Sequence, residues 1–419
     1  MPKNWKIYKL EEVAQLRKEG IKPSDFNGED YIGLEHIGQG DFLLDGIGKA
    51  SDVKSNKSKF VEGDILYGKI RPYFKKVYRP KFSGICSTDI LIINTKNENL
   101  VSQSYLHHLI KTQEFTDKAT ETSSGTKMPR ADWKSLEKWG ISFPPLPEQT
   151  QIANILSAID DKIENNLAIN KTLEDMAMAL YKHWFVDFGP FQDGEFIDSE
   201  LGLIPKGWEV KRLEELSEIG SSKRIFRKEY VDEGIPFYRS KEVIQLSKGN
   251  NISTELFIIA ERFQEIKIKF GSPKKGDILI SSVGTIGVSW LVDDSDDFYF
   301  KDGNLTWLKK YKSYIKGEFL HLWLNSNIGQ EQILGETIGS TQKALTISAL
   351  RSLKLVVPPK SIYQKVELDI INSYSQIQLN QSEVQTLTKL RDTLLPKLIS
   401  GEVRLKEFRE GIDAEINSA

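Results

Sequence analysis

Residues 151–183 read QIANILSAIDDKIENNLAINKTLEDMAMALYKH. Positions spaced alternately by three and four residues form an almost continuous seam in this stretch: Ile152, Ile155, Ile159, Lys162, Asn166, Ile169, Leu173, Met176, Leu180 and His183. Such spacing is typical of a helix that packs a heptad seam against a partner helix. The pattern predicts a helix of about 35 to 40 residues, far longer than the usual ~11 to 12 residues, and so favours a coiled coil.

A second stretch near the end of the chain repeats the pattern. Its seam is Tyr363, Val366, Ile370, Ser373, Ile377, Asn380, Val384, Leu387, Arg391, Leu394 and Leu398. We expect the two helices to pair, although two ordinary amphipathic helices on separate cores are the alternative. Asn166 and Asn380 occupy equivalent seam positions, where a buried polar residue fixes the register of a coiled coil.

Connectivity predicts the direction of the pair. The first helix leads into the second half of the chain and the second helix leads out of it, so paired seams must run antiparallel. At ~1.5 Å per residue each helix spans about 55 Å. We therefore expect a domain at each end of a rod, related by a pseudo-twofold axis.

The chain is an internal duplication. Residues 5–12 (WKIYKLEE) match residues 208–215 (WEVKRLEE), and 63–66 (GDIL) match 276–279. Behind residue 106 the offset between the copies stays at 214. Insertions are therefore tolerated in the front of each copy and not in its back, which indicates variable domains on a rigid frame.

Short β-rich runs bounded by turn residues fill the front of each copy, with helical stretches such as 104–112 between them. Examples are 89–94 (DILIIN), 277–281 (DILIS), 287–292 (GVSWLV) and 354–357 (KLVV). The expected fold class is α+β: two homologous mixed α/β domains separated by an antiparallel two-helix coiled coil. We expect a first domain at 1–147, a first long helix at 148–188, a linker at 189–205, a second domain at 206–359, a second long helix at 360–400 and a tail at 401–419.

Composition excludes several classes of protein. The chain has 39% hydrophobic and 28% charged residues, and no apolar run is long enough to span a bilayer. Its first residues lack the apolar core of a signal peptide. Cys86 is the lone cysteine, so no internal disulfide or thiolate metal cluster can form, which fits a reducing cytoplasm. A net charge of −2 means that any affinity for nucleic acid must come from local basic patches.

No catalytic site, metal site or cofactor site is evident in the sequence. Residues 271–276 have the glycine spacing of a phosphate loop, but Asp277 stands where the lysine is needed. The nuclease-like tripeptide 265–267 (EIK) occurs by chance in any charged chain, and we interpret it as part of a solvated face. The histidines lack metal-ligand spacing beyond the adjacent pair His107 and His108. We therefore predict a protein that is not an enzyme and needs no cofactor.

Four motifs resemble those of the Type I restriction-modification specificity-subunit family: 144–149 (PPLPEQ), 184–190 (WFVDFGP), 203–208 (LIPKGW) and 391–401 (RDTLLPKLISG). Their order around a duplicated unit makes the resemblance specific, and it covers nearly the whole chain. The start of the second helix departs from it, because 358–364 (PPKSIYQ) lacks the Pro-Glu pair and carries one extra residue before Gln364.

The resemblance implies a DNA-binding subunit without catalytic activity. Each domain would be a target-recognition domain that reads one part of a bipartite site in double-stranded DNA. Partner methyltransferase subunits, expected to be two, would dock on the helices and methylate adenine, and restriction subunits would join them. Residues 143–146 (FPPL) and 357–360 (VPPK) lack the Asn/Asp-Pro-Pro-aromatic loop of an amino-methyltransferase, in agreement with this division. The alternatives are an enzyme fused to a specificity half, and an adaptor that binds only proteins.

Candidate DNA contacts lie in basic segments interleaved with aromatic residues and in small polar loops. Residues 67–82 (YGKIRPYFKKVYRPKF) contain six cations and no acid. The alternative for this segment is a hairpin with one solvated face and its aromatic residues in the core, and for the loops it is a plain turn. The candidates are Lys69, Arg71, Tyr73, Lys75, Lys76, Lys127 and Arg130 in the first domain, and Lys223, Arg224, Arg227, Arg239, Lys241, Ser282, Thr285, Gln342 and Lys343 in the second.

An apolar cluster closes the first long helix. Trp184, Phe185 and Phe188 precede Pro190 at its end. They either pack this helix onto the second domain, which we favour, or contact a methyltransferase partner.

Overall fold

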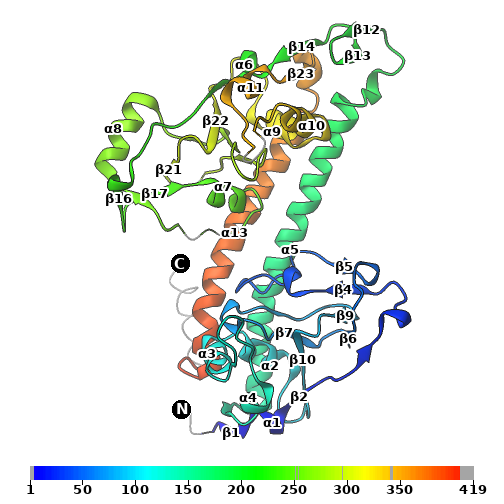
Figure 1. Ribbon diagram of the computed structural model, residues 1–419, viewed down its shortest axis with the longest axis vertical. Helices are drawn as coiled ribbons and strands as arrows, with labels where there is room; N and C mark the ends of the chain where they lie inside the picture. The colour runs from blue at the N-terminus through cyan, green and yellow to red at the C-terminus, as the bar shows by residue number, and fades with distance from the viewer. Residues whose placement is uncertain (1–3, 251, 253, 295, 340–342, 406–419) are drawn as a thin grey trace, which may run out of the picture. The chain divides into compact units, whose positions relative to one another are not determined.

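The computed structural model describes residues 4–250, 252, 254–294, 296–339 and 343–405. The chain forms two compact units (Figure 1). The first unit comprises Met1–Asn165 and Thr386–Ala419, and the second comprises Asn166–Gln385. Two long helices, α5 (Leu146–Phe185) and α13 (Glu367–Ser400), each contribute a segment to both units.

The first unit is built on three sheets. The central sheet has the order β2 (Ala14–Leu16), β10 (Ile90–Thr95), β7 (Ile65–Gly68), β8 (Val77–Tyr78). A five-stranded sheet has the order β3 (Gly20–Ile21), β6 (Lys57–Phe60), β9 (Gly84–Cys86), β4 (Asp30–Ile32), β5 (Gly48–Lys49), and β1 (Lys6–Lys9) pairs with β11 (Gly140–Phe143). Aliphatic residues such as Leu66, Ile90 and Ile92 fill the core between the two larger sheets.

Short helices complete the first unit. They are α1 (Leu10–Val13), α2 (Gln103–Ile110), α3 (Gln113–Glu121) and α4 (Trp133–Leu136). The helix α2 begins where the Ser102 hydroxyl accepts a hydrogen bond from the amide of Tyr105, and α3 begins with the same cap at Thr112. The α2 face that includes Tyr105 and Leu109 is buried.

The second unit repeats the central sheet. Its order is β15 (Glu218–Gly220), β22 (Leu305–Lys309), β19 (Ile278–Ser281), β20 (Ser289–Leu291), and β14 (Glu209–Arg212) pairs with β23 (Lys354–Val357). These strands correspond in order and direction to those of the first unit. The duplication and the mixed α/β fold class predicted from the sequence are therefore confirmed.

The second unit also has elements of its own. A further sheet has the order β16 (Tyr230–Val231), β18 (Phe257–Ile258), β17 (Ile235–Tyr238), β21 (Tyr299–Phe300). The helices are α6 (Leu213–Leu216), α7 (Ser240–Leu246), α8 (Ala260–Phe270), α9 (Gly317–Asn325), α10 (Asn327–Gly335) and α11 (Ile347–Ser352). The half-buried imidazole of His321 on α9 has its Nδ1 atom 2.7 Å from the Tyr374 hydroxyl, and desolvation lowers the pKa of His321 to about 4.

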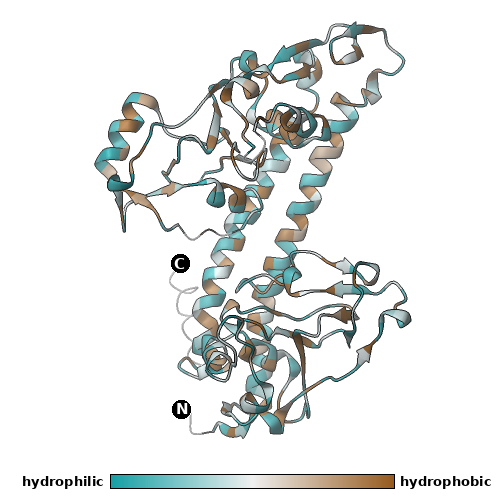
Figure 2. Cartoon of the chain, in the orientation of Figure 1, coloured by the Kyte–Doolittle hydropathy of each residue, from teal (hydrophilic) through white to brown (hydrophobic). Residues whose placement is uncertain are grey.

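The two long helices pair antiparallel within each unit. In the first unit Arg404, just beyond α13, pairs with Glu148 at 3.1 Å, and Arg391 pairs with Asp160 at 3.6 Å. In the second unit the Asn380 amide donates to the Asn170 carbonyl oxygen at 2.8 Å. Both helices show hydrophobic and hydrophilic bands in alternation (Figure 2). The coiled-coil expectation is confirmed, including the burial of Asn166 and Asn380.

The seam of α5 follows a different phase from the predicted one. Ile152, Ile159 and Asn166 are buried as expected. The positions between them lie one residue later than predicted, because the buried residues are Leu156, Ile163 and Asn170 rather than Ile155, Lys162 and Ile169. Apolar residues stand side by side along this helix, so spacing alone does not determine which neighbour faces the partner.

Two other expectations need correction. The second helix is interrupted, because α12 (Lys360–Tyr363) ends in a turn over 364–366 before α13 begins. The segment expected to be a linker, 189–205, contains a short 3-10 helix (Gly189–Phe191) and the hairpin β12 (Phe196–Ser199) and β13 (Gly202–Pro205). Ile204 of this hairpin is buried in the core of the second unit, so the segment belongs to that unit.

Candidate nucleic-acid interface

The basic segment of the first unit leaves the central sheet and returns to it. Between β7 and β8 the chain forms a single 3-10 turn, Pro72–Phe74, flanked by Arg71 and Lys75. Tyr67, ahead of the turn, is completely buried, whereas the Tyr73 ring is 49% exposed. Some of the aromatic residues of this segment therefore form the core, while the turn itself is presented to solvent; its DNA contacts stay a prediction.

Backbone contacts join this turn to the loop before α4. The amide of Arg71 donates to the Pro129 carbonyl at 2.7 Å, and the amide of Ala131 donates to the Lys69 carbonyl at 2.9 Å. Bridges also link Arg130 to Ile70 and to Ser124. We call these two joined segments, 69–75 and 124–131, the clasp of the first unit. The clasp brings together the predicted contacts Lys69, Arg71, Tyr73, Lys75, Lys127 and Arg130.

Part of the positive charge of the clasp is neutralised within it. Asp89, which the sequence analysis missed, lies 3.3 Å from the Lys69 ammonium and 3.8 Å from the Arg130 guanidinium. Lys127 is exposed. A carboxylate 20 or 41 residues away from its partners gives no local signal, so only the fold reveals this pairing.

Lys76 does not fit its predicted role. Its ammonium donates to the backbone carbonyls of Leu34 and Ile37, at 2.6 and 2.5 Å. Burial lowers the pKa of Lys76 below its ordinary value. The side chain therefore holds a loop of its own unit and is not directed to a phosphate.

The second unit contains an equivalent clasp with different side chains. Bridges link Ala344 to Val283 and to Ile338. The prediction for Ser282 is wrong, because this residue is buried and its hydroxyl lies 2.7 Å from that of Thr306. Thr285 and Lys343 are exposed. Gln342 lies outside the described residues.

Three of the six predicted cations of the second unit have acidic neighbours. Arg239 pairs with Glu242 at 2.7 Å and with Glu255 at 3.1 Å, and Lys241 also pairs with Glu255. The hydrogen bond with Glu242 raises the pKa of Arg239. Arg224 pairs with Asp302 at 3.2 Å. These carboxylates offset much of the positive potential that a phosphate would meet.

Two further predicted residues of this unit are exposed cations. The Lys223 ammonium lies 4.3 Å from the centre of the Phe270 ring. Arg227 begins a 3-10 turn, Arg227–Glu229. Both stand at the surface of the unit, outside its clasp.

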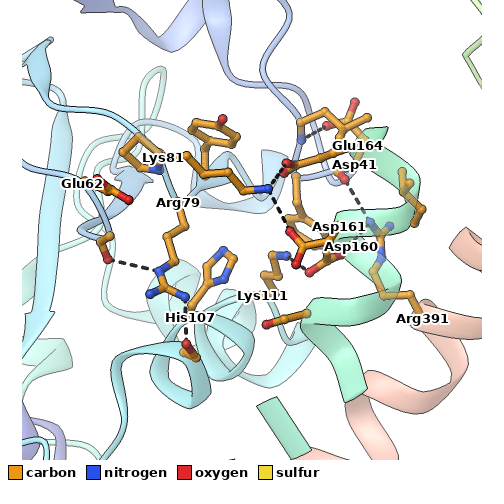
Figure 3. Close-up of a pocket in the computed structure, with 18 of the residues that line it drawn as sticks. Asp41, Glu62, Arg79, Lys81, His107, Lys111, Asp160, Asp161, Glu164 and Arg391 are labelled. Carbon is orange, nitrogen blue, oxygen red and sulfur yellow. Dashed lines mark hydrogen bonds and ion pairs between the residues drawn. The ribbon is translucent and has the colours of Figure 1, made fainter. Parts of the chain in front are cut away.

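A polar cavity of about 320 Å³ lies in the first unit where α2 meets α5 and α13 (Figure 3). On its wall Asp160 accepts a hydrogen bond from the Lys111 ammonium at 2.6 Å and lies 3.6 Å from the Arg391 guanidinium. Both cations also lie over the Phe42 ring, at 4.8 and 4.9 Å. Burial alone would raise the pKa of Asp160, but the charges of Lys111 and Arg391 hold it below its ordinary value.

The two histidines of α2 lie beside this cluster as neutral side chains. Burial lowers the pKa of His108 to about 3 and holds that of His107 well below its ordinary value, and Lys111 contributes to both shifts. The His108 ring nitrogen Nε2 lies 3.0 Å from the Ser157 hydroxyl on α5. The contacts of this cluster attach α2 to the long helices.

The aromatic cluster at the end of α5 packs inside the second unit. Phe185 is buried, with its ring centre 5.0 Å from that of Phe319. Phe188 lies 5.3 Å from Trp208, and Trp184 contacts Phe191. This placement agrees with the packing interpretation of Trp184, Phe185 and Phe188.

Neither a metal centre nor a membrane segment is evident in the described part of the chain. No group of three or more His, Cys, Asp or Glu residues there is arranged to hold a metal ion. Among the same residues, no helix combines the length and apolar character that crossing a membrane requires.

Comparison with known families also finds a duplication in this chain. The Type I restriction modification DNA specificity domain matches the chain twice, over residues 2–175 and 205–389. The chain belongs to this family. The resemblance inferred from the motifs is confirmed, and the protein is a Type I restriction-modification specificity subunit.

Relatives match along almost the full length. The Type I restriction enzyme MjaIX specificity subunit of Methanocaldococcus jannaschii is 28% identical over 430 residues, which cover 97% of this chain and 95% of the relative. The HindI specificity subunit of Haemophilus influenzae is 25% identical over 472 residues, covering 96% and 100%. The crystal structure of a Type I S subunit from M. genitalium has a similar fold, with a TM-score of 0.57, 18% identity, and coverage of 94% and 96%.

Proposed function

We propose that this specificity subunit reads a bipartite site in double-stranded DNA, one part with each unit, and directs partner subunits to it. In this proposal the recognition domains are residues 1–147 and 206–359. The long helices α5 and α13 form the frame on which methyltransferase subunits dock, and restriction subunits join that assembly. The protein acts in the cytoplasm, without a cofactor of its own.

The observation that carries this proposal is the duplicated clasp. Two copies of one backbone arrangement hold different side chains within a chain of the DNA specificity family. Identical readers would favour a symmetric site, whereas readers with different side chains favour two unrelated half-sites. Phosphate contacts would position each unit, and contacts to base edges would select the sequence.

Within each unit we propose a small set of DNA contacts. In the first unit they are Arg71, Tyr73, Lys75 and Lys127, together with the Asp89-paired cations Lys69 and Arg130. In the second unit they are Thr285, Lys343, Lys223 and Arg227, and the ion-paired Arg224, Arg239 and Lys241 contribute less. Exposed cations release counterions when they meet phosphate, so binding should weaken as the salt concentration rises.

We also propose that the subunit does not catalyse methyl transfer or cleavage. The chain alone, supplied with S-adenosylmethionine and DNA, should transfer no methyl group. Methylation should begin when a methyltransferase subunit is added. Methyl transfer by a pure preparation of the chain would support the enzyme-fusion alternative.

Gel-shift and random-site selection test the central claim. The full-length chain is incubated with a random duplex library, with and without methyltransferase subunits, and bound DNA is sequenced. We expect enrichment of two short sequences separated by an unspecified spacer. Binding to the methyltransferase without any sequence enrichment would instead identify a protein adaptor.

A further inference from the structure

The two clasps can be aligned residue by residue from their backbone contacts. The Ala131 amide donates to the Lys69 carbonyl at 2.9 Å, as the Leu345 amide does to the Ser282 carbonyl at 2.9 Å. The bridge from Ile70 to Arg130 has its equivalent between Val283 and Ala344. Lys69 therefore corresponds to Ser282, and Arg130 corresponds to Ala344.

The alignment extends through the turn at the tip of each clasp. The Gly68 amide donates to the Lys76 carbonyl, and the Ser281 amide donates to the Val288 carbonyl in the same way. Counting forward from the first residue of each pair, Arg71 corresponds to Gly284. Counting back from the second residue, Lys75 corresponds to Gly287, and the second turn is one residue shorter.

Both corners of the turn adopt the left-handed conformation in both units. The φ angles are 50° at Arg71 and 49° at Lys75, against 79° at Gly284 and 84° at Gly287. Glycine adopts this conformation without strain, whereas a residue with a side chain does not. The first unit thus carries two cations at corners where the shared backbone favours glycine.

The fold does not require a side chain at the first of these corners. A Cβ atom built at Gly284 meets no other atom within 4 Å. In the first unit the structure records neither an ion pair nor a side-chain hydrogen bond from Arg71 to any described residue, and its guanidinium lies 5.8 Å from the Phe74 ring. We therefore infer that the Arg71 side chain contacts a ligand outside its own unit.

The neighbouring charges support this interpretation. Lys69 and Arg130 share Asp89, and all three are replaced in the second unit by uncharged residues: Ser282, Ala344 and Asn304. These three charges are thus absent together from the second unit, as expected of a local ion cluster whose members depend on one another. Arg71 has no such compensating carboxylate, so its charge remains available to a ligand.

We propose that Arg71 determines specificity by reading a guanine in the half-site of the first unit, a contact for which the second unit has no counterpart. This inference rests on the proposed function. A guanidinium fork matches the O6 and N7 acceptors of guanine in the major groove, and this is the commonest specific contact between proteins and DNA. Lys75, at the other corner, is a flexible point charge suited to a phosphate.

Arg71→Gly tests the proposal, with Lys75→Gly as its matched control. Both variants remove one positive charge and relieve one left-handed corner. The full-length chain with its methyltransferase subunits is used for site selection and for affinity measurements on single-base variants of the selected site. Arg71→Gly should lose about 5- to 150-fold in preference for a G·C pair at one position of one half-site, with the other half-site unchanged.

The controls should behave differently. Lys75→Gly should weaken binding to all sequences alike. Arg71→Lys keeps the charge but lacks the fork, so it should lose much of the same guanine preference. The melting temperature of Arg71→Gly should not fall, because the variant restores the residue that the backbone favours.

Three outcomes would overturn the proposal. Unchanged base preference in Arg71→Gly would show that the residue reads no base, and uniform weakening would identify a phosphate contact. A fall in melting temperature would show that the side chain serves the fold. Wild-type protein that enriches no sequence at all would instead refute the proposed function.

Discussion

Replacing Asp160 by asparagine would separate the charge of this residue from its shape. The carboxylate lies between the Lys111 ammonium, at 2.6 Å, and the Arg391 guanidinium, at 3.6 Å. The Lys111 and Arg391 side chains are only 2% and 3% exposed. An asparagine fills the same space and keeps one oxygen acceptor, but it leaves the buried Lys111 ammonium without its ion-pair partner, while Arg391 keeps its pair with Asp392 at 2.9 Å.

The expected cost is about 3 to 5 kcal/mol in the free energy of unfolding, because removing one partner leaves buried charge uncompensated. The loss is limited because Lys111 can give up its proton. Holding a lysine neutral at pH 7, against an unfolded pKa of ~10.4, costs about 5 kcal/mol. Since a typical domain is stable by only ~5 to 15 kcal/mol, the first unit of Asp160→Asn should unfold readily.

This escape route gives the variant a distinctive pH dependence. If folding requires Lys111 to be neutral, the unfolded state binds one more proton than the folded state. Stability then rises with pH, by about 1.4 kcal/mol per unit between pH 7 and 10. Wild-type protein should show a weaker rise, because Asp160 stabilises the charged ammonium.

Urea unfolding at pH 7 and pH 9, with hydrogen exchange of α2 to report on the first unit, measures both quantities. Asp161→Asn is the matched control, because Asp161 is 63% exposed and its pair with Lys81 should contribute less than ~1 kcal/mol. If Asp160→Asn cost no more than this control, the argument that α2 is fastened by buried charge would be wrong.

Three other perturbations test separate parts of the molecule. The pKa of His321 is about 4 in the folded protein and ~6.5 in the unfolded protein, so the stability present above pH 6.5 is lost as the pH falls. His321→Gln should therefore reduce, by about 2 kcal/mol, the loss of stability that urea unfolding measures between pH 7 and pH 5. Asn170→Leu should cost ~1 to 3 kcal/mol by leaving the Asn380 amide unpaired, and Asn380→Leu added to it should recover stability in a double-mutant cycle; further destabilisation would contradict this. Lys127→Ala should weaken DNA binding at all sequences alike and reduce the salt slope by about 1, whereas Lys171→Ala on α5 should change neither, as gel shifts in a salt series would show.

The parts of the fold that depend on local or periodic signals could be predicted from the sequence. Both long helices, the internal repeat and the strand Lys354–Val357 followed from spacing and composition. The phase of the α5 seam did not, because Ile155 and Leu156 are both apolar and only the partner helix selects between them. The break after Tyr363 was likewise hidden by an uninterrupted apolar pattern.

The chemistry of the site was less accessible from the sequence. Composition identified Arg71 and Lys127 as candidate DNA contacts, and the structure leaves Arg71 partly exposed and Lys127 exposed. Composition also selected Ser282, whose hydroxyl is buried against Thr306. Burial and ion pairing depend on residues far away in the chain, as the pairing of Lys69 with Asp89 illustrates. A left-handed corner without glycine leaves no mark in a sequence at all.

The equivalent strands β7 and β19 show how the two units keep the same backbone arrangement with different side chains. A buried aspartate precedes each strand, Asp64 before β7 and Asp277 before β19. Its carboxylate accepts a hydrogen bond from the backbone amide three residues earlier, at 2.9 Å for Asp64 and 3.1 Å for Asp277. Its remaining partner differs, being the Arg17 guanidinium in one unit and the Trp307 indole in the other. The part common to both units is thus a backbone amide bonded to an equivalent aspartate side chain, whereas the clasps share contacts between backbone groups. Side chains that take no part in these bonds can therefore change without altering the frame, and this freedom is what a family of DNA readers requires.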